Sequence, residues 1–306
     1  MKRDLVLLAA CVAALVATVR APAQEGTTDR SEPRFTAGLH VQGFWYDNFF
    51  QVPAGQPQDE VTATAAAGRV AGRPWADRPF TLYGSAGLTR FSDDLGDSPS
   101  FGAGARWAGR PAAWDLHLEL QQDRPVVDVG DALGEADVAT LGGEYSHRLT
   151  DDWQVSALGE LQRQDFSAAD GRDNDFRMVG GAVRYRGWGY DFSPEIGAET
   201  GERDADDPGE DHDQTDVWVK LRSAPVRDLY LSLRYRLRDR EYTVADPAAA
   251  NFGREDDRSQ WSLIADWTVV TPWTLTLYWA YEDADSTKPA RVFTTQILAV
   301  GVRYDL

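Results

Sequence analysis

The residues of this chain that are best suited to bind a solute are basic residues at every second position. Arg234, Arg236 and Arg238 alternate with apolar residues, and Lys220 and Arg222 show the same spacing upstream. Because successive side chains of a β-strand point to opposite faces, this spacing places the cations on one face of two strands. Guanidinium groups bind carboxylates and phosphates through paired hydrogen bonds. The sequence therefore predicts a basic ladder suited to acidic solutes.

Acidic residues recur on earlier segments with related spacing. The candidate acids are Asp115, Glu119, Glu160, Asp191, Glu195 and Glu199. Two basic residues, Arg184 and Arg186, lie between them in the sequence. In an aqueous passage, opposed acidic and basic walls would create a transverse field that orients polar solutes and sets ion preference. Alternatively, the two sets lie on neighbouring strands, pair with each other and fill a narrow interior. The residue pattern leaves both interpretations open.

The segments that must position these side chains alternate apolar and polar residues. The alternation is clear over 34–46, 80–88, 114–121, 229–238 and 273–281. A tilted strand crosses a membrane in about 9–11 residues, with apolar residues facing lipid and polar residues facing water. The pattern predicts an all-β fold, a transmembrane antiparallel up-and-down β-barrel over 34–306 of about fourteen strands, with twelve or sixteen as alternatives. A soluble β-sandwich is the other fold that alternation alone would allow.

Links and tryptophans support the barrel independently. Short links near 109–112 and 150–152 alternate in order with long ones near 122–136 and 241–257, as expected for short periplasmic turns and long outer loops. Tryptophans concentrate where an apolar belt meets lipid headgroups. One predicted girdle, beside the short links, comprises Trp107, Trp114, Trp153, Trp188, Trp267 and Trp273, and the other comprises Trp45, Trp261 and Trp279.

The N-terminus has the layout of a secretory signal peptide. Lys2 and Arg3 precede an apolar run, and small residues lie ahead of a predicted cleavage site after Ala23. Residues 1–23 are therefore expected to be removed, and 24–33 to form a flexible periplasmic lead. Cys11, the single cysteine, lies within the removed segment, so the mature chain can form no disulfide. The alternative is that Cys11 is the lipidated first residue of a lipoprotein.

The charge of the mature chain excludes several classes of partner. The whole chain has 31 basic and 49 acidic residues, and removal of 1–23 leaves 28 and 48, a net charge of −20. Nucleic acid and anionic membrane surfaces would repel such a chain. The acidic stretch 202–213 lacks the ligand spacing of an EF-hand, so we predict a solvated segment, no metal site and no cofactor.

The histidines do not favour an enzyme. Ser146 and His147 are adjacent on one predicted strand and must point to opposite faces. His40 and His117 are expected to face the barrel interior without a serine at a suggestive spacing, and His212 falls in the acidic stretch. A Ser-His or Asp-His catalytic constellation is therefore the least favoured interpretation.

The C-terminal segment 300–306 resembles the targeting strand of Gram-negative outer-membrane β-barrels, with Val302, Tyr304 and Leu306 on the lipid face. These strands usually end in an aromatic residue, whereas this chain ends in Leu306. A resemblance to porin-like barrels covers nearly all of 34–306. It implies a multi-pass barrel in the cell outer membrane, inserted by the barrel-assembly machinery and in contact with outer-membrane lipids and lipopolysaccharide.

The sequence therefore favours a porin-like channel for passive diffusion of small polar or charged solutes. The alternative is a barrel component of an export or surface-assembly system for an acidic polysaccharide or another polymer, acting with a periplasmic partner. We expect a monomer. The predicted long loops 202–214 and 241–257 are the candidates to fold inward over the passage.

Overall fold

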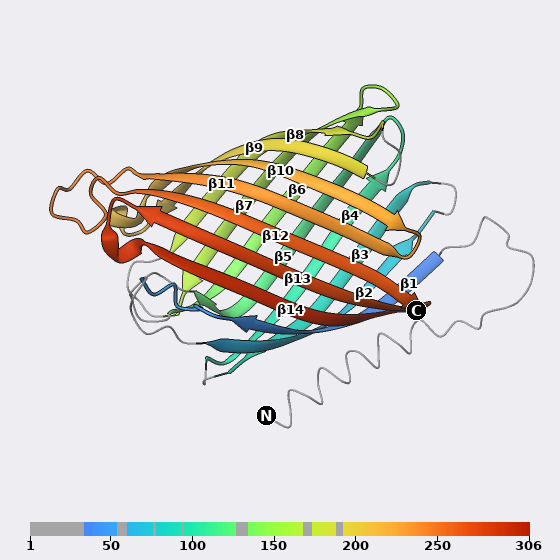
Figure 1. Cartoon of the computed structure of the whole chain (residues 1–306), viewed down its shortest axis with the longest axis horizontal. Helices are drawn as coiled ribbons and strands as arrows, with labels where there is room; N and C mark the ends of the chain where they lie inside the picture. The colour runs from blue at the N-terminus through green and yellow to red at the C-terminus, as the bar shows by residue number, and fades with distance from the viewer. Residues whose placement is uncertain are drawn as a thin grey trace, which may run out of the picture.

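The chain forms a closed antiparallel barrel in which each strand pairs with its neighbours in the sequence and the last pairs with the first (Figure 1). The computed structural model describes residues 34–53, 60–75, 78–92, 95–126, 134–167, 173–187 and 192–306. The predicted signal peptide, Cys11 and the predicted lead fall outside these ranges. The predicted number of fourteen strands is confirmed.

The strands and two short 3₁₀ helices follow in order: β1 (Arg34–Tyr46), β2 (Val61–Arg73), β3 (Phe80–Phe91), β4 (Asp97–Ala108), β5 (Ala112–Val126), β6 (Gly134–Arg148), β7 (Trp153–Phe166), β8 (Asn174–Tyr185), β9 (Phe192–Ala205), η1 (Pro208–Glu210), β10 (His212–Val226), β11 (Leu229–Tyr242), β12 (Glu255–Val270), β13 (Trp273–Ser286), η2 (Pro289–Arg291) and β14 (Phe293–Asp305). No helix among the described residues is long and apolar enough to cross a membrane.

Alternation along each strand separates an apolar outer face from a polar inner face. On β11, Leu237 is 48% exposed on the outside, whereas Ser232 is 3% exposed and lies on the inside with Arg234. An apolar exterior is compatible with lipid, and the closed ladder satisfies the backbone groups that lipid cannot.

Pairing of β1 with β14 closes the barrel. The register runs from Gly38 opposite Asp305 to Tyr46 opposite Ile297. Beyond the strand, the Leu306 amide donates a hydrogen bond to the Ala37 carbonyl at 2.6 Å. Closure leaves no edge strand that could pair with another chain.

The predicted tryptophans that the structure describes face outward, and several pack on a neighbouring tyrosine. Trp153 lies 4.9 Å from Tyr185 and Trp273 lies 4.6 Å from Tyr304, measured between ring centroids. Both pairs sit at the end of the barrel with short turns. Trp188 lies outside the described residues. Trp218 belongs to neither girdle, because its position on β10 directs it inward, where it is 5% exposed.

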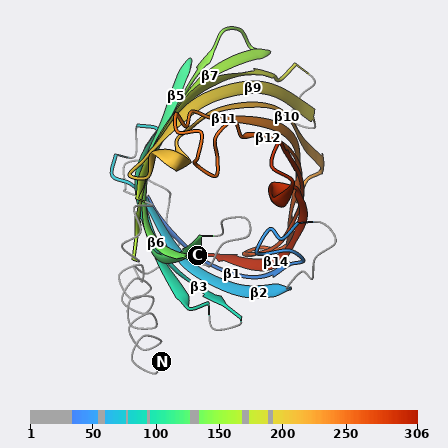
Figure 2. The ribbon, with the colours of Figure 1, turned by 90° about the vertical axis from the view of Figure 1, so that its left-hand side faces the viewer.

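At the opposite end, the strands extend further than the sequence predicts. Pairing of β9 with β10 continues to Arg203 opposite His212, so the predicted long link 202–214 contracts to a six-residue turn around η1. The segment between β11 and β12 and the η2 turn lie within the outline of the barrel mouth in Figure 2.

The inward segment between β11 and β12 is held by a buried polar network. Arg254, only 2% exposed, donates from Nε to Asp256 at 2.9 Å and from Nη1 to Asn251 at 2.9 Å. Its guanidinium lies 4.2 Å from the Tyr242 ring centroid. Asn251 in turn donates to Glu210 at 2.9 Å, which ties the segment to η1. Buried polar contacts therefore fix this segment to the rim of the barrel.

Candidate functional site

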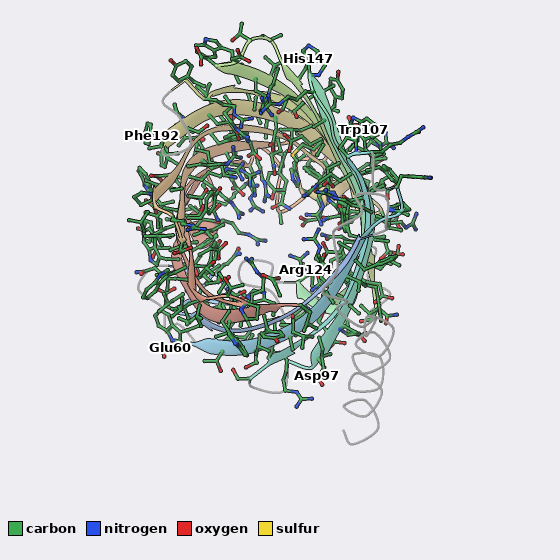
Figure 3. All side chains as sticks on the ribbon, turned by 90° about the vertical axis from the view of Figure 1, so that its right-hand side faces the viewer. Glu60, Asp97, Trp107, Arg124, His147 and Phe192 are labelled. Atoms are coloured by element: carbon green, nitrogen blue, oxygen red, sulfur yellow. The ribbon has the colours of Figure 1, made fainter. Side chains whose placement is uncertain are left out.

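The basic ladder lines a cavity of about 570 Å³ on the inner face of the outer half of the barrel. Among the described residues that line it, six are arginines and two are glutamates. The arginines are Arg124, Arg203, Arg234, Arg236, Arg238 and Arg240, and the glutamates are Glu160 and Glu199. Arg124 comes from β5 and projects into the interior in Figure 3, whereas most of the other arginines come from β11. The cavity is thus strongly electropositive.

Part of the ladder is neutralised by one buried carboxylate. Asp216 on β10 is 1% exposed and lies directly opposite Arg238. It accepts a hydrogen bond from Arg238 Nε at 2.9 Å and forms an ion pair with Arg236. Gln214 Nε2 also donates to it at 3.1 Å. Cross-strand register brings these groups together, because residues opposite each other in an antiparallel pair lie about 5 Å apart.

Other cations of the site have no carboxylate partner among the described residues. Arg234 makes no hydrogen bond there and lies 4.9 Å from the Trp218 ring centroid. Arg240 donates only to the amide oxygen of Gln214, at 2.8 Å. Arg124 and Arg203 make no ion pair with a described carboxylate. No described carboxylate therefore neutralises any of these four guanidinium groups.

Lys220 and Arg222 differ in their pairing. Glu195, 7% exposed, accepts hydrogen bonds from Arg222 at 2.5 and 3.2 Å and forms an ion pair with Arg184. Lys220 lies between Glu195 and Arg234 in the register and makes no ion pair with a described residue. Lys220 and Arg234 are therefore like charges directly opposite each other.

The predicted acids fall into two groups. Glu195 and Glu199 lie beside the ladder, and Glu199 accepts a hydrogen bond from Trp218 Nε1 at 3.2 Å and lies 3.9 Å from Arg236. Glu119 on β5 and Glu160 on β7 lie further round the wall and have no hydrogen bond or ion pair among the described residues. Acids on strands beside the ladder are thus paired with its cations, whereas Glu119 and Glu160 have no partner among the described residues.

The remaining candidates occupy separate places. Asp115 accepts hydrogen bonds from Tyr83 at 2.6 Å and Arg106 at 2.5 Å near the end of the barrel with short turns. Arg186 donates to Gln154 at 3.1 Å. Asp191 lies outside the described residues.

The histidines are dispersed round the barrel. Ser146 faces inward and His147 outward, on opposite faces of β6. His117 faces inward, 3.9 Å from Asp115, and His40 faces inward on β1. His212 lies at the outer end of β10 and contacts the Glu210 carbonyl oxygen at 3.1 Å. Within the described part of the chain, no group of three or more histidine, cysteine or acidic side chains could hold a metal ion.

Sequence reasoning missed three residues that shape the site: Asp216, Trp218 and Arg124. The first two follow the same period of two as the ladder on β10, so the period itself could have identified them. A glycine opposite Trp218 lets its ring lie flat on the wall, since a Cβ at Gly197 would approach the ring to 2.3 Å. No sequence signal placed Arg124 near the ladder, because β5 is far from β11 in the chain.

A second cavity, of about 540 Å³, adjoins the first and has a different character. Arg124 and Gln164 line both cavities. Four aromatic side chains that line the second one, Phe44, Tyr46, Phe49 and Phe91, form what we call the aromatic patch. Consecutive rings are in contact, with centroids 6.2 Å apart for Phe44 and Tyr46 and 5.7 Å apart for Phe49 and Phe91.

Comparison with solved structures places this architecture among known barrels. OmpT of Vibrio cholerae, an outer membrane protein, superimposes with TM-scores of 0.50 for the form folded in vitro and 0.51 for the form expressed in the outer membrane. The two alignments cover 93% and 92% of this chain and 100% and 99% of the other, each at 11% identity. This chain has the fold of an outer-membrane β-barrel. An anion-selective porin from Comamonas acidovorans also aligns, with a TM-score of 0.48 and 8% identity over 90% of this chain and all of that one.

Sequence comparison adds no closer relationship. No protein-family model matches the chain. No curated protein matches it either. The solved barrels therefore define the fold alone.

Proposed function

We propose that this porin-like barrel is a passive diffusion channel of the outer membrane for small polar solutes, with a preference for anions. The observation that carries this proposal is the set of arginines in the outer cavity that no described carboxylate neutralises. Rings of fixed charge in a pore set ion preference by attracting the opposite charge. The closed barrel, which has the fold of an outer membrane protein, is compatible with a channel.

The opposition of Lys220 and Arg234 supports a preference for anions. Like charges directly opposite each other on an antiparallel pair destabilise the sheet. A passing anion that lies between the two side chains relieves that repulsion. Glu119 and Glu160 lie on β5 and β7, away from the ladder, and Glu160 lines the same cavity as the arginines. Such separated charges would orient a solute that carries a dipole.

Planar-bilayer recording tests the proposal. Purified, folded protein should give stable conductance steps, and the reversal potential in a KCl gradient should show that chloride is more permeant than potassium. The double variant R234Q/R240Q should lower the chloride-to-potassium permeability ratio by about two- to fivefold, as expected for the loss of two partly screened charges. The matched control is R177Q, which removes an outward arginine paired with Glu202.

The outcomes distinguish this function from its alternative. A cation preference in the wild-type channel would contradict the anion selectivity. Silence from protein shown to be folded by its heat-sensitive electrophoretic mobility would contradict the channel and favour an export barrel that needs a periplasmic partner.

We also propose that Val302, Tyr304 and Leu306 act as the recognition signal for the assembly machinery. All three belong to the closing strand or its end, and Val302 and Leu306 are 42% and 49% exposed on the outer face. Insertion as a monomer in contact with lipid and lipopolysaccharide remains the expected state.

A further inference from the structure

The aromatic patch occupies a place where a simple diffusion channel would have polar residues. Phe44, Tyr46 and Phe91 lie on inward-facing positions of β1 and β3, and all are partly exposed rather than packed away. Apolar surface in contact with water is unfavourable by roughly 25 cal/mol per Å². An exposed apolar patch rimmed by polar residues commonly marks a binding surface.

Anchoring of the outer loop does not account for the patch. The loop that follows β1 is held by polar contacts, since Asn48 donates to the Thr294 carbonyl at 2.8 Å and to the Val52 carbonyl at 3.0 Å. The Asp47 carboxylate also accepts a hydrogen bond from the Gln296 amide at 2.5 Å. Of the rings in the patch, only Phe49 belongs to that loop. Phe44 and Phe91 lie on strands that the barrel ladder already holds in place.

An arginine that pairs with no described carboxylate adjoins the patch. Arg124 lines the cavity of the aromatic patch as well as that of the basic ladder, and no described carboxylate pairs with it. The carboxylate that lines the aromatic cavity, Glu282, is engaged by Arg258 at 3.3 Å and Gln260 at 3.2 Å. Arg124 is therefore the charged group that an incoming solute meets beside the rings.

We propose that the outer vestibule binds aromatic carboxylates, with the carboxylate on Arg124 and the ring against Phe44 and Phe91. This inference rests on the proposed anion channel and names its preferred class of solute. Arginine binds a carboxylate with two parallel hydrogen bonds, and aromatic rings favour contact at centroid distances of about 4.5–7 Å. Each cavity, of about 570 and 540 Å³, lies in the range that encloses a small ligand.

The basic ladder then provides the exit from this site. A carboxylate released from Arg124 reaches Arg203 or Arg234 in the adjoining cavity, since all three line the same space. Efficient conduction requires binding that is favourable enough for entry and divided over several sites for release. A neutral aromatic molecule lacks the charge for the ladder, and acetate lacks the ring for the patch.

Calorimetric titration of the folded, full-length mature protein in detergent micelles tests the site without relying on conduction. Benzoate should bind about tenfold more tightly than acetate, because ring contacts contribute about 1 kcal/mol or more. Benzyl alcohol, which keeps the ring and lacks the charge, should bind more weakly than benzoate by at least about tenfold. Equal affinities for benzoate and acetate would overturn the proposal.

Matched variants separate the two parts of the site. R124Q should weaken benzoate binding about tenfold, whereas R73Q, which removes an exposed arginine at the far end of β2, should leave it unchanged. The double variant F44L/F91L should reduce benzoate affinity towards that of acetate, and F101L, which alters an outward ring that is 51% exposed, should not. Unchanged benzoate binding in R124Q or in F44L/F91L would exclude the assigned residues.

Conductance measured on the same preparations keeps the two proposals distinct. Benzoate should reduce the chloride current at concentrations where acetate does not, and R124Q should remove this block. A conducting, anion-selective barrel that binds benzoate no better than acetate would retain the channel and overturn the aromatic site. A barrel that does not conduct but binds benzoate selectively would retain the aromatic site and overturn the channel.

Discussion

Two walls of the same barrel carry very different inward residues. The wall of β9 to β12 faces β1, β2 and β14 across the barrel (Figure 2). The first wall carries long charged side chains, whereas the second carries small residues at Ala63, Ala65, Ala67 and Gly301, with the aromatic patch towards one end and Arg69 and Arg303 towards the other. Both walls obey the same alternation, so the fold does not require the difference. Small side chains leave space along the middle of one wall, and the opposite wall supplies the basic ladder. The passage is therefore asymmetric in both side-chain size and charge.

The two walls also differ in how side chains are held. On the charged wall, Asp216 and Glu195 each pair with two arginines from the strands beside them. On the small wall, inward residues make few polar contacts, and closure depends on the backbone ladder. Substitutions should therefore affect stability mainly on the charged wall and conductance mainly on the small wall.

The largest effect is expected from D216N. The substitution removes the carboxylate of Asp216 that Arg236 and Arg238 share, and these arginines are only 18% and 21% exposed. Removal of one partner from a buried ion pair typically costs about 3–5 kcal/mol. Urea unfolding of the protein in lipid vesicles should show a loss of that size. D257N, which changes an exposed outward aspartate on β12, is the control, and equal stability of the two variants would refute the role of Asp216.

A smaller effect is expected from G197A. The added Cβ would lie 2.3 Å from the Trp218 ring, so the ring must leave the wall and enter the lumen. Overpacking of this kind costs about 1–3 kcal/mol. Single-channel conductance should fall together with stability. G159A is the control, because the nearest atom to a Cβ there is 3.9 Å away. Unchanged conductance in G197A would show that Trp218 does not limit the passage.

Placing charge on the small wall should change selectivity more than stability. A65R adds a cation between Gln42 and Thr89 in the register, within the stretch of small residues on this wall. The chloride-to-potassium permeability ratio should rise by about two- to fivefold, since a partly screened charge in the lumen contributes about 0.5–1 kcal/mol. Conductance should also fall. A65Q provides the size of the side chain without its charge, and an equal change of selectivity in A65Q would count against a charge effect.

The smallest effect is expected from R90Q. The pair of Arg90 and Asp97 is fully outside the lumen, with side chains 48% and 42% exposed and an Nη2 to Oδ2 distance of 2.7 Å. Exposed ion pairs contribute little to stability. Unfolding and ion selectivity should both match the wild type within error. A measurable shift in selectivity would mean that charge outside the lumen contributes to the field that we assign to the ladder.

The sequence by itself determined the architecture and the inner and outer face of each strand. A period of two is a local property, and it fixed the inward direction of Arg234 and the outward direction of Trp273 without knowledge of any neighbour. Antiparallel neighbours and short turns then made a closed barrel the consistent solution, because lipid does not tolerate an unpaired strand edge.

Only the tertiary structure decided which charges are neutralised and which are free. Pairing depends on register, and a shift of one residue along β10 would have moved Asp216 to the lipid face and left its arginines alone. The structure also brought Arg124 from β5 to the same cavity as β11, a contact between segments more than a hundred residues apart. The net charge of −18 for the whole chain gave no indication of an electropositive lumen. Total charge is a sum over residues, whereas the field that a solute meets depends on where folding places each charge.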